Sequence, residues 1–320
     1  MKRFALLVVT VLFACHVLAQ DEFPSRALRY VVPLPPGAGA DFIGRTVAEK
    51  MGADLGKPVV VENRAGASGS IGSEFVAKAA PDGHTLLQCY IATHGTNPAV
   101  SKLPYDPVKD FAAIGMVAVT PNVLVVNAKV PARTLGDFVA LARAKAKSLS
   151  YASTGTGSAT HLTMAYLEQQ AKIELVHVPY KGAAPATTDL LGGQVDAMFP
   201  SLVTALPHIR AGRLRALAVS AAKRSPLLPE VPTVSESGYP AFDSLQWYAL
   251  CAPAGTPKAV VDRLNASLNR TLTSADVRDR LGEQAADVMP TTSAEAAEYI
   301  RREVAKWTRL IKDTGLKLEP

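Results

Sequence analysis

The sequence has few cysteines, few aromatic residues and no long uninterrupted hydrophobic segment. Only three cysteines occur among 320 residues, and none stands in a spacing typical of a zinc or redox motif. Every hydrophobic run ends before the roughly 20 residues needed to cross a bilayer. Lys and Arg outnumber Asp and Glu only by 34 to 28, and they are scattered along the chain. Membrane-spanning, zinc-finger and nucleic-acid-binding classes are therefore excluded.

Spacings typical of active sites are missing as well. No HxH or HExxH pattern includes any of the histidines His84, His94, His161, His177 and His208. The segment GASGS at 66–70 differs from the GxSxG elbow, and no Walker loop or GxGxxG follows the first expected strand. A hydrolase built on Ser158 and His161 is conceivable, but residues three apart on one helix seldom reach the geometry of nucleophilic catalysis. We expect no enzyme activity, no metal ion and no cofactor.

The first residues have the order of a secretory signal peptide. Lys2 and Arg3 precede an apolar run to Ala14, and small residues end at Ala19. We expect residues 1–19 to be removed and the mature chain to be periplasmic. Cleavage and lipidation at Cys15 is the alternative, which Phe13 fits poorly.

The mature chain is long enough for two domains. Its two cysteines, Cys89 and Cys251, lie in apolar runs that predict buried strands. An oxidising compartment would allow them to pair. We favour two core thiols, because cross-strand geometry seldom suits a disulfide.

Apolar runs that predict strands alternate with helical periodicity, which is typical of parallel α/β sheets. The pattern restarts near residue 127, where Thr134 and Asp137 form a capping-box start. After a proline-rich connection, one strand (WYALCAPA) and a helical tail follow, the last helix opening at Thr292 and Glu295. We therefore predict a discontinuous first domain, 20–126 plus 248–320, and a second domain, 127–247, joined by crossings near 126 and 247.

Three glycine-rich turns lie between a predicted strand and a helix: 35–41, 65–72 and 153–158. Ligands of open α/β sheets bind beyond the carboxyl ends of the strands, and helix starts attract anions. The first and third turns occupy comparable places in the two halves, so they could face each other across a cleft. Each glycine also has a purely structural explanation as a turn residue.

Many motifs occur in an order that closely resembles the Bug family, the receptors of tripartite tricarboxylate transporters. They include RYVVPLPPGAGADFIGR, VVVENRAGASGSIGSEFVAKAAPDGHTLL, LSYASTGTGSATHL, VHVPYKGAAPATTDLLGGQVDAMF and RSPLLPEVPTVSESGYP. The resemblance covers nearly the whole mature chain. It implies a type II periplasmic-binding-protein fold, with two α/β domains that close around a ligand cleft.

The resemblance further implies that two turns form a pincer for a small carboxylate, such as a di- or tricarboxylate, an acidic amino acid or an aromatic acid. One jaw would contain Pro36, Gly37, Ala38, Gly39 and Asp41, where Ala38 replaces the glycine usual in the family. The other jaw would contain Ser153, Gly155, Gly157, Ser158 and His161, and the second-rank candidates are Tyr180 and Lys181.

We therefore expect a monomeric periplasmic receptor that hands a carboxylate to membrane transporter subunits. An enzyme using the same cleft, and a ligand-sensing partner of a signalling protein, are the alternatives. Side chains that select the ligand are expected in the loops CYIATHGTNPAV and MFPSLVTAL.

Overall fold

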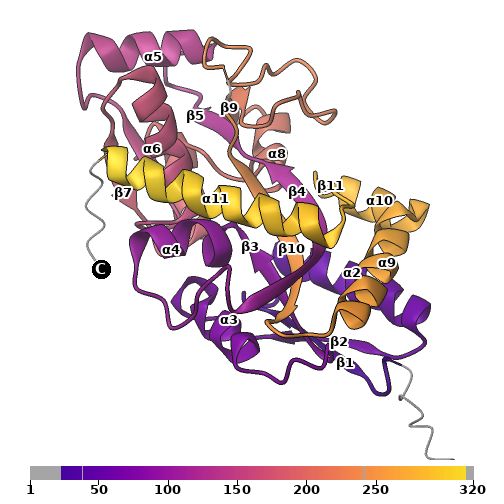
Figure 1. Cartoon of the computed structure of the whole chain (residues 1–320). Coiled ribbons are helices and arrows are strands. Elements are labelled where there is room, and N and C mark those ends of the chain that lie inside the picture. Colours follow the sequence, from indigo (N-terminus) through magenta and orange to yellow (C-terminus); the bar gives the residue numbers. More distant parts are fainter. Residues whose placement is uncertain (1–22, 38, 241, 315–320) are drawn as a thin grey trace, which may run out of the picture.

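The computed structural model describes residues 23–37, 39–240 and 242–314, which form two β-sheets with helices on both faces of each (Figure 1). The six-stranded sheet has the order β11-β4-β10-β3-β1-β2, and the five-stranded sheet has the order β7-β6-β8-β5-β9. The predicted α/β architecture with two sheet-containing units is confirmed. The expected signal peptide, residues 1–19, lies outside the described residues.

The elements alternate as predicted along most of the chain, but the tail that was expected to be wholly helical also contains a two-residue strand, β11. The six-stranded sheet contains β1 (Leu28–Val32), β2 (Val59–Asn63), β3 (Thr85–Tyr90), β4 (Phe111–Pro121), β10 (Leu245–Pro253) and β11 (Asp287–Val288). The five-stranded sheet contains β5 (Val123–Asn127), β6 (Ser150–Ser153), β7 (Val176–Pro179), β8 (Ala197–Met198) and β9 (Leu214–Val219). The helices are α2 (Gly39–Leu55), η1 (Ala67–Gly69), α3 (Ser70–Ala77), η2 (Ala92–Thr96), α4 (Asn97–Val100), α5 (Leu135–Ala144), α6 (Ala159–Ala171), α7 (Ala183–Gly192), α8 (Leu202–Arg210), α9 (Lys258–Thr273), α10 (Ala275–Gly282) and α11 (Ser293–Thr314).

Both sheets are mixed rather than purely parallel. β1 pairs in parallel with β2 and β3, whereas β10 runs antiparallel to both β3 and β4. In the second sheet β6 pairs in parallel with β7 and β8, and β5 runs antiparallel to β8 and β9. β5 and β10, which follow the two crossings, are antiparallel to their neighbours, and so is the two-residue edge strand β11, which pairs with β4.

The chain passes between the sheets at Asn122 and again at Ser244, a few residues before each expected crossing. Asn122 Nδ2 donates to the carbonyl of Ser244 at 2.9 Å, and the Asn122 N–H donates to Ser220 Oγ at 2.9 Å. The Ser220 hydroxyl also donates to Ser244 O at 2.5 Å. These hydrogen bonds join the two crossing segments side by side, and all three residues are fully buried.

Each sheet is packed between two hydrophobic clusters. In the first unit, α2, α9 and α10 cover one face, and α3, η2 and α11 cover the other. α11 is the long yellow helix that runs across the front of Figure 1 and reaches α6 of the second unit. The capping boxes predicted at Thr134 and Thr292 are both present. Local sequence therefore sets these two helix starts.

Cys89 and Cys251 are joined in a disulfide, so the favoured interpretation of two free core thiols is wrong. Cys251 lies opposite Leu87 on β3, two residues from Cys89. The two side chains therefore lie diagonally on the same face of the sheet, with a Cα–Cα distance of 6.3 Å. That separation is within the range that a disulfide can span.

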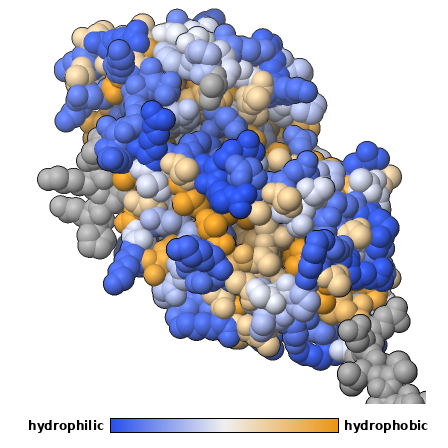
Figure 2. All heavy atoms as spheres, in the orientation of Figure 1, coloured by the Kyte–Doolittle hydropathy of each residue, from blue (hydrophilic) through white to orange (hydrophobic). Residues whose placement is uncertain are grey.

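The described surface is largely polar. On the face drawn in Figure 2, hydrophilic residues cover most of the surface, and hydrophobic residues gather near its middle. The exposed large hydrophobic side chains come from separate segments: Val60, Ile71, Val108 and Val176. Within residues 23–314, none of the described helices combines the length and the apolar character needed to span a membrane.

Candidate functional site

A cleft of about 320 Å³ is lined by residues of both units. The second unit contributes the beginnings of three helices, α6, α7 and α8, and the first unit contributes mainly neutral polar and aromatic side chains. None of the described lining residues is Lys, Arg, His, Asp or Glu. The lining residues of the first unit are Leu34, Ser68, Tyr90, Ala92, Asn97, Gln246 and Tyr248.

The start of α6 provides the clearest anion-binding geometry in the cleft. Ser158 is its N-cap, and its hydroxyl accepts the N–H of His161 at 3.3 Å. Ala159 and Thr160 follow as the first helical residues, whose N–H groups have no acceptor within the helix. All three line the cleft. The positive end of the helix dipole therefore faces the space where a ligand would lie.

Two more helices begin at the cleft wall. Ala183 is the first residue of α7, and Ser201 precedes the first residue of α8. Both residues line the cleft. Helix starts of this kind can bind carboxylate or phosphate oxygens without a basic side chain.

Two stacked imidazole rings form hydrogen bonds with the turn 153–158. Gly157 donates its N–H to Nδ1 of His161 at 3.0 Å, and Ser153 Oγ lies 2.7 Å from Nε2 of His177. The two imidazoles stack at 3.8 Å and 4°, and Tyr151 stacks on His177 at 4.9 Å. His161 is buried and is absent from the cleft lining. It therefore positions the turn rather than touching the cleft.

Both imidazoles are neutral at physiological pH. Burial, together with the neighbouring His177, lowers the pKa of His161 to about 3. Burial lowers the pKa of His177 to about 4. Neutrality matters because Nδ1 of His161 must be unprotonated to accept the N–H of Gly157.

The second glycine-rich turn, which the sequence did not assign to the pincer, reaches the cleft through Ser68. Residues 66 to 69 have successive φ values of 125°, 45°, 53° and 89°, although two of them are not glycine. The hydroxyl of Tyr90 and Nδ2 of Asn97 both donate to the carbonyl of Ser68 at 3.0 Å. These two contacts hold the strained turn in place before α3.

The first predicted jaw lies beside the cleft rather than in its lining. Pro36, Gly37 and Gly39 are exposed, Ala38 lies outside the described residues, and only Leu34 at the start of the turn lines the cleft. The carboxylate of Asp41 is buried and accepts the Gly37 N–H at 2.9 Å, as well as Nε of Arg45 and Nδ2 of Asn63.

These contacts give Asp41 a structural role in its own turn. Burial would raise its pKa, but the hydrogen bonds from Arg45, Gly37 and Asn63 lower it overall. Asp41 is therefore ionised and stabilises the turn through these hydrogen bonds.

In the third turn, Ser158 is the one predicted residue that lines the cleft. Gly155 donates its N–H to Ser153 Oγ at 3.2 Å, so these two residues shape the turn from inside. Tyr180 donates its hydroxyl to Asp189 at 2.7 Å, and Lys181 is exposed. The structure brings these second-rank residues near the start of α7 but not into the lining.

Both loops expected to carry selective side chains contribute to the cleft. Tyr90, Ala92 and Asn97 come from the first, and Met198, Pro200, Ser201 and Thr204 come from the second. Sequence reasoning missed Gln246 and Tyr248, which lie on β10 directly after the second crossing. A polar residue at the start of a buried returning strand is the signal that could have identified Gln246.

Two α/β units with a cleft between them define the class of periplasmic solute-binding proteins, and solved structures of that class superpose on this chain. A protein of R. palustris solved with adipate has a TM-score of 0.82 and 32% identity, covering 92% of this chain and 99% of its own. MatC of Rhodopseudomonas palustris, solved with bound malate, has a TM-score of 0.78 and 35% identity, covering 90% and 100%.

Sequence comparison then gives the family. The model of the tripartite tricarboxylate transporter family receptors matches residues 43–316, so the chain belongs to this family of periplasmic receptors. BugT of Bordetella pertussis is 36% identical over 307 residues, covering 94% of this chain and 93% of that protein. The resemblance to the Bug family and the type II periplasmic-binding-protein fold are thus confirmed, and the family comprises receptors rather than enzymes.

Proposed function

We propose that the chain captures a small organic carboxylate in the cleft between its units and delivers it to the membrane subunits of a tripartite tricarboxylate-type transporter. One observation carries the proposal: three helix starts meet at a cleft whose described lining has no charged side chain. Such a site favours an anion through N–H groups and helix dipoles. The relatives solved with adipate and malate support a carboxylate as that anion.

Ligand contact is assigned first to the start of α6, Ser158 to Thr160, and to the side chains of the opposite wall. In this proposal the first turn, in which Pro36, Gly37 and Gly39 are exposed, moves toward the ligand on closure and joins the site. Gly155, Gly157 and His161 then act by shaping the turn before α6. Tyr180 and Lys181 flank the start of α7.

Closure would be a rigid-body motion of the two units about the paired crossings. Asn122, Ser220 and Ser244 hold these crossings together through direct hydrogen bonds. Gln246 Nε2 lies 3.4 Å from Oδ1 of Asn122 and also lines the cleft, so it links the hinge to the site. In this proposal, the residues between the crossings at Asn122 and Ser244, a few positions earlier than the expected 127–247, move as one domain against the rest.

A thermal-shift screen tests the ligand class. Monocarboxylates, dicarboxylates, tricarboxylates, aromatic acids and amino acids are compared at equal concentration, and the best ligand is then titrated by calorimetry. We expect a carboxylate to raise the melting temperature and its amide analogue to have no effect. Stabilisation by the amide alone, or by no acid in the set, would contradict the proposal.

Export is tested separately by the intact mass of the secreted protein. We propose that the mature chain begins at Gln20, after the small-residue site ending at Ala19. A lipid-modified amino terminus at Cys15 would overturn this assignment.

A further inference from the structure

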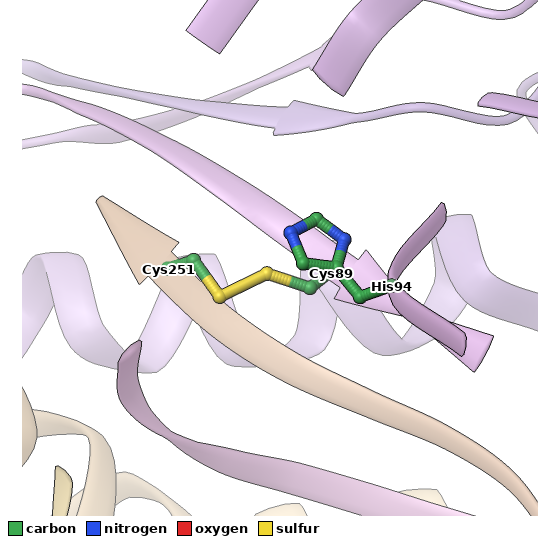
Figure 3. A group of neighbouring side chains, drawn as sticks. All are labelled: Cys89, His94 and Cys251. Carbon is green, nitrogen blue, oxygen red and sulfur yellow. A yellow bond between two sulfur atoms is a disulfide. The ribbon is translucent and has the colours of Figure 1, made fainter. Parts of the chain in front are cut away.

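Three side chains that can bind metal ions lie together in the core, between the six-stranded sheet and η2. Cys89, His94 and Cys251 are fully buried, and one ligand atom of each lies within 4.8 Å of the others. Figure 3 shows the imidazole of His94 beside the bond between the two sulfur atoms. Phe111 packs edge-on against the same ring at 4.6 Å. The cluster therefore lies in an apolar environment.

Hydrogen bonds around His94 assign its ring proton. The hydroxyl of Thr93 donates its single hydrogen to the carbonyl of Tyr90 at 3.2 Å. The same Thr93 oxygen lies 2.9 Å from Nδ1 of His94, and the tautomer that satisfies both contacts carries its proton on Nδ1. A neutral imidazole protonated on Nδ1 has a bare lone pair on Nε2. Nε2 is consequently an acceptor.

That acceptor has no partner within the described part of the chain. Nε2 of His94 is buried, and no described group forms a hydrogen bond with it. Leaving a buried acceptor unpaired is costly, and most such groups in proteins have a partner. A disulfide has no proton to donate. A cation bound between the sulfur atoms and Nε2 would satisfy the lone pair.

We propose that the reduced form of this cluster binds one thiophilic cation, Zn²⁺ or Cu⁺, through Cys89, Cys251 and His94. A dithiol reductant first cleaves the bond between the two sulfur atoms and becomes a disulfide itself, and its two hydrogens pass to the cysteines. The cation then displaces the two thiol protons. Two bonds to sulfur and one to Nε2 form, and the cation is neither oxidised nor reduced.

The two cations differ in what the site offers them. Two thiolates neutralise the charge of Zn²⁺, but Zn²⁺ usually has four ligands. Soft thiolates also select Cu⁺. The described cluster has three ligands and therefore does not supply the fourth that Zn²⁺ usually takes. Both cations share the thiolate chemistry, so the experiment compares them.

A cation bound in this cluster would affect residues that line the cleft. Tyr90 follows Cys89 directly on β3, Tyr248 precedes Cys251 by three residues on β10, and Ala92 opens η2. All three of these neighbours line the cleft. Exchanging the disulfide for a cation would change the spacing of the strands directly behind the cleft. The proposed cation site itself does not depend on the proposed carboxylate.

The test uses the purified protein in both redox states. One sample is unfolded in guanidinium chloride with a dithiol reductant and refolded anaerobically, and the other keeps its disulfide. Each is titrated with Co²⁺, whose thiolate absorption reports sulfur ligation, and then competed with Zn²⁺ and with Cu⁺. We expect about one cation per chain in the reduced sample and none in the oxidised sample.

Variants identify the ligands. His94→Gln should weaken cation binding at least about tenfold, and Cys89→Ala with Cys251→Ala should abolish it. His208→Gln, a change outside the cluster, should bind as the wild type does. A refolded chain with two titratable thiols that takes up neither cation would overturn the proposal. Equal uptake by the oxidised sample would overturn it too, because the sulfur atoms would not be ligands.

Discussion

Replacing Gly157 by Val tests whether ligand binding depends on the backbone conformation of the third turn. Gly157 has φ +76° and donates to His161, and a Cβ added there would lie 3.4 Å from Cγ2 of Val100 in the first unit. A residue other than glycine at this φ costs about 1–2 kcal/mol before any crowding. The turn can relieve that strain only by moving, which would displace the start of α6.

Gly212 provides a matched control. It has φ +67° in the turn between α8 and β9, and a Cβ added there meets no atom within 4 Å. Gly212→Val therefore has a similar backbone cost without a contact across the units. We expect both variants to lose about 1–2 kcal/mol of unfolding free energy. Only Gly157→Val should weaken ligand binding, by more than about tenfold or about 1.4 kcal/mol.

The assay combines calorimetric titration of the best carboxylate with a melting curve for each variant. A folded Gly157→Val protein that binds with the affinity of the wild type would refute the assignment of this turn to the site. An equal loss in Gly212→Val would show that general destabilisation accounts for the effect. Gly37→Val, at φ +82° in open space, extends the series to the first turn: a loss of binding without a larger loss of stability would place that turn against the ligand.

Three further outcomes are expected. Ser158→Ala should lower both affinity and stability by about 1 kcal/mol each, because one hydroxyl caps α6 and lines the cleft; calorimetry and urea unfolding measure the two losses. Glu303→Ala should cost about 3 kcal/mol of stability in urea unfolding, since its carboxylate accepts both buried tryptophan indoles. The folded-state pKa values of His161, His177 and the buried His94 are low, so on acidification the unfolded chain binds protons at a higher pH than the folded chain does. The free energy of unfolding should therefore be full above about pH 6.5 and fall toward pH 4 by about 1.4 kcal/mol per pH unit for each histidine. Urea midpoints measured across this range test the expected fall.

Local sequence was sufficient for the elements whose boundaries depend on nearby residues. Thr134, Ser158 and Thr292 were predictable as helix starts because each side chain bonds a backbone N–H three residues later. The succession of strands from β1 to β10 was predictable from alternating periodicities, whereas the two-residue strand β11 was not. These features require no knowledge of which strands are neighbours.

Contacts that depend on which strands are paired could not be predicted from the sequence. Cys89 and Cys251 are 162 residues apart, and only the antiparallel pairing of β3 with β10 places them on one face. The same pairing places Tyr90 and Tyr248 directly opposite each other, and both line the cleft. A one-residue change of register would have turned each of these side chains to the other face.

The turn at residues 66 to 69 shows why glycine content alone does not identify a binding loop. Three glycine-rich turns were visible in the sequence, and the two in comparable positions were preferred. The structure brings Ser68 of the remaining turn to the cleft beside Ser158 of the third turn, with Ser68 at φ 53°. Tyr90 and Asn97 keep this non-glycine residue in a left-handed conformation through its carbonyl oxygen. Because both partners come from elements more than 20 residues further along the chain, the conformation depends on tertiary contacts, and so does the shape of the cleft.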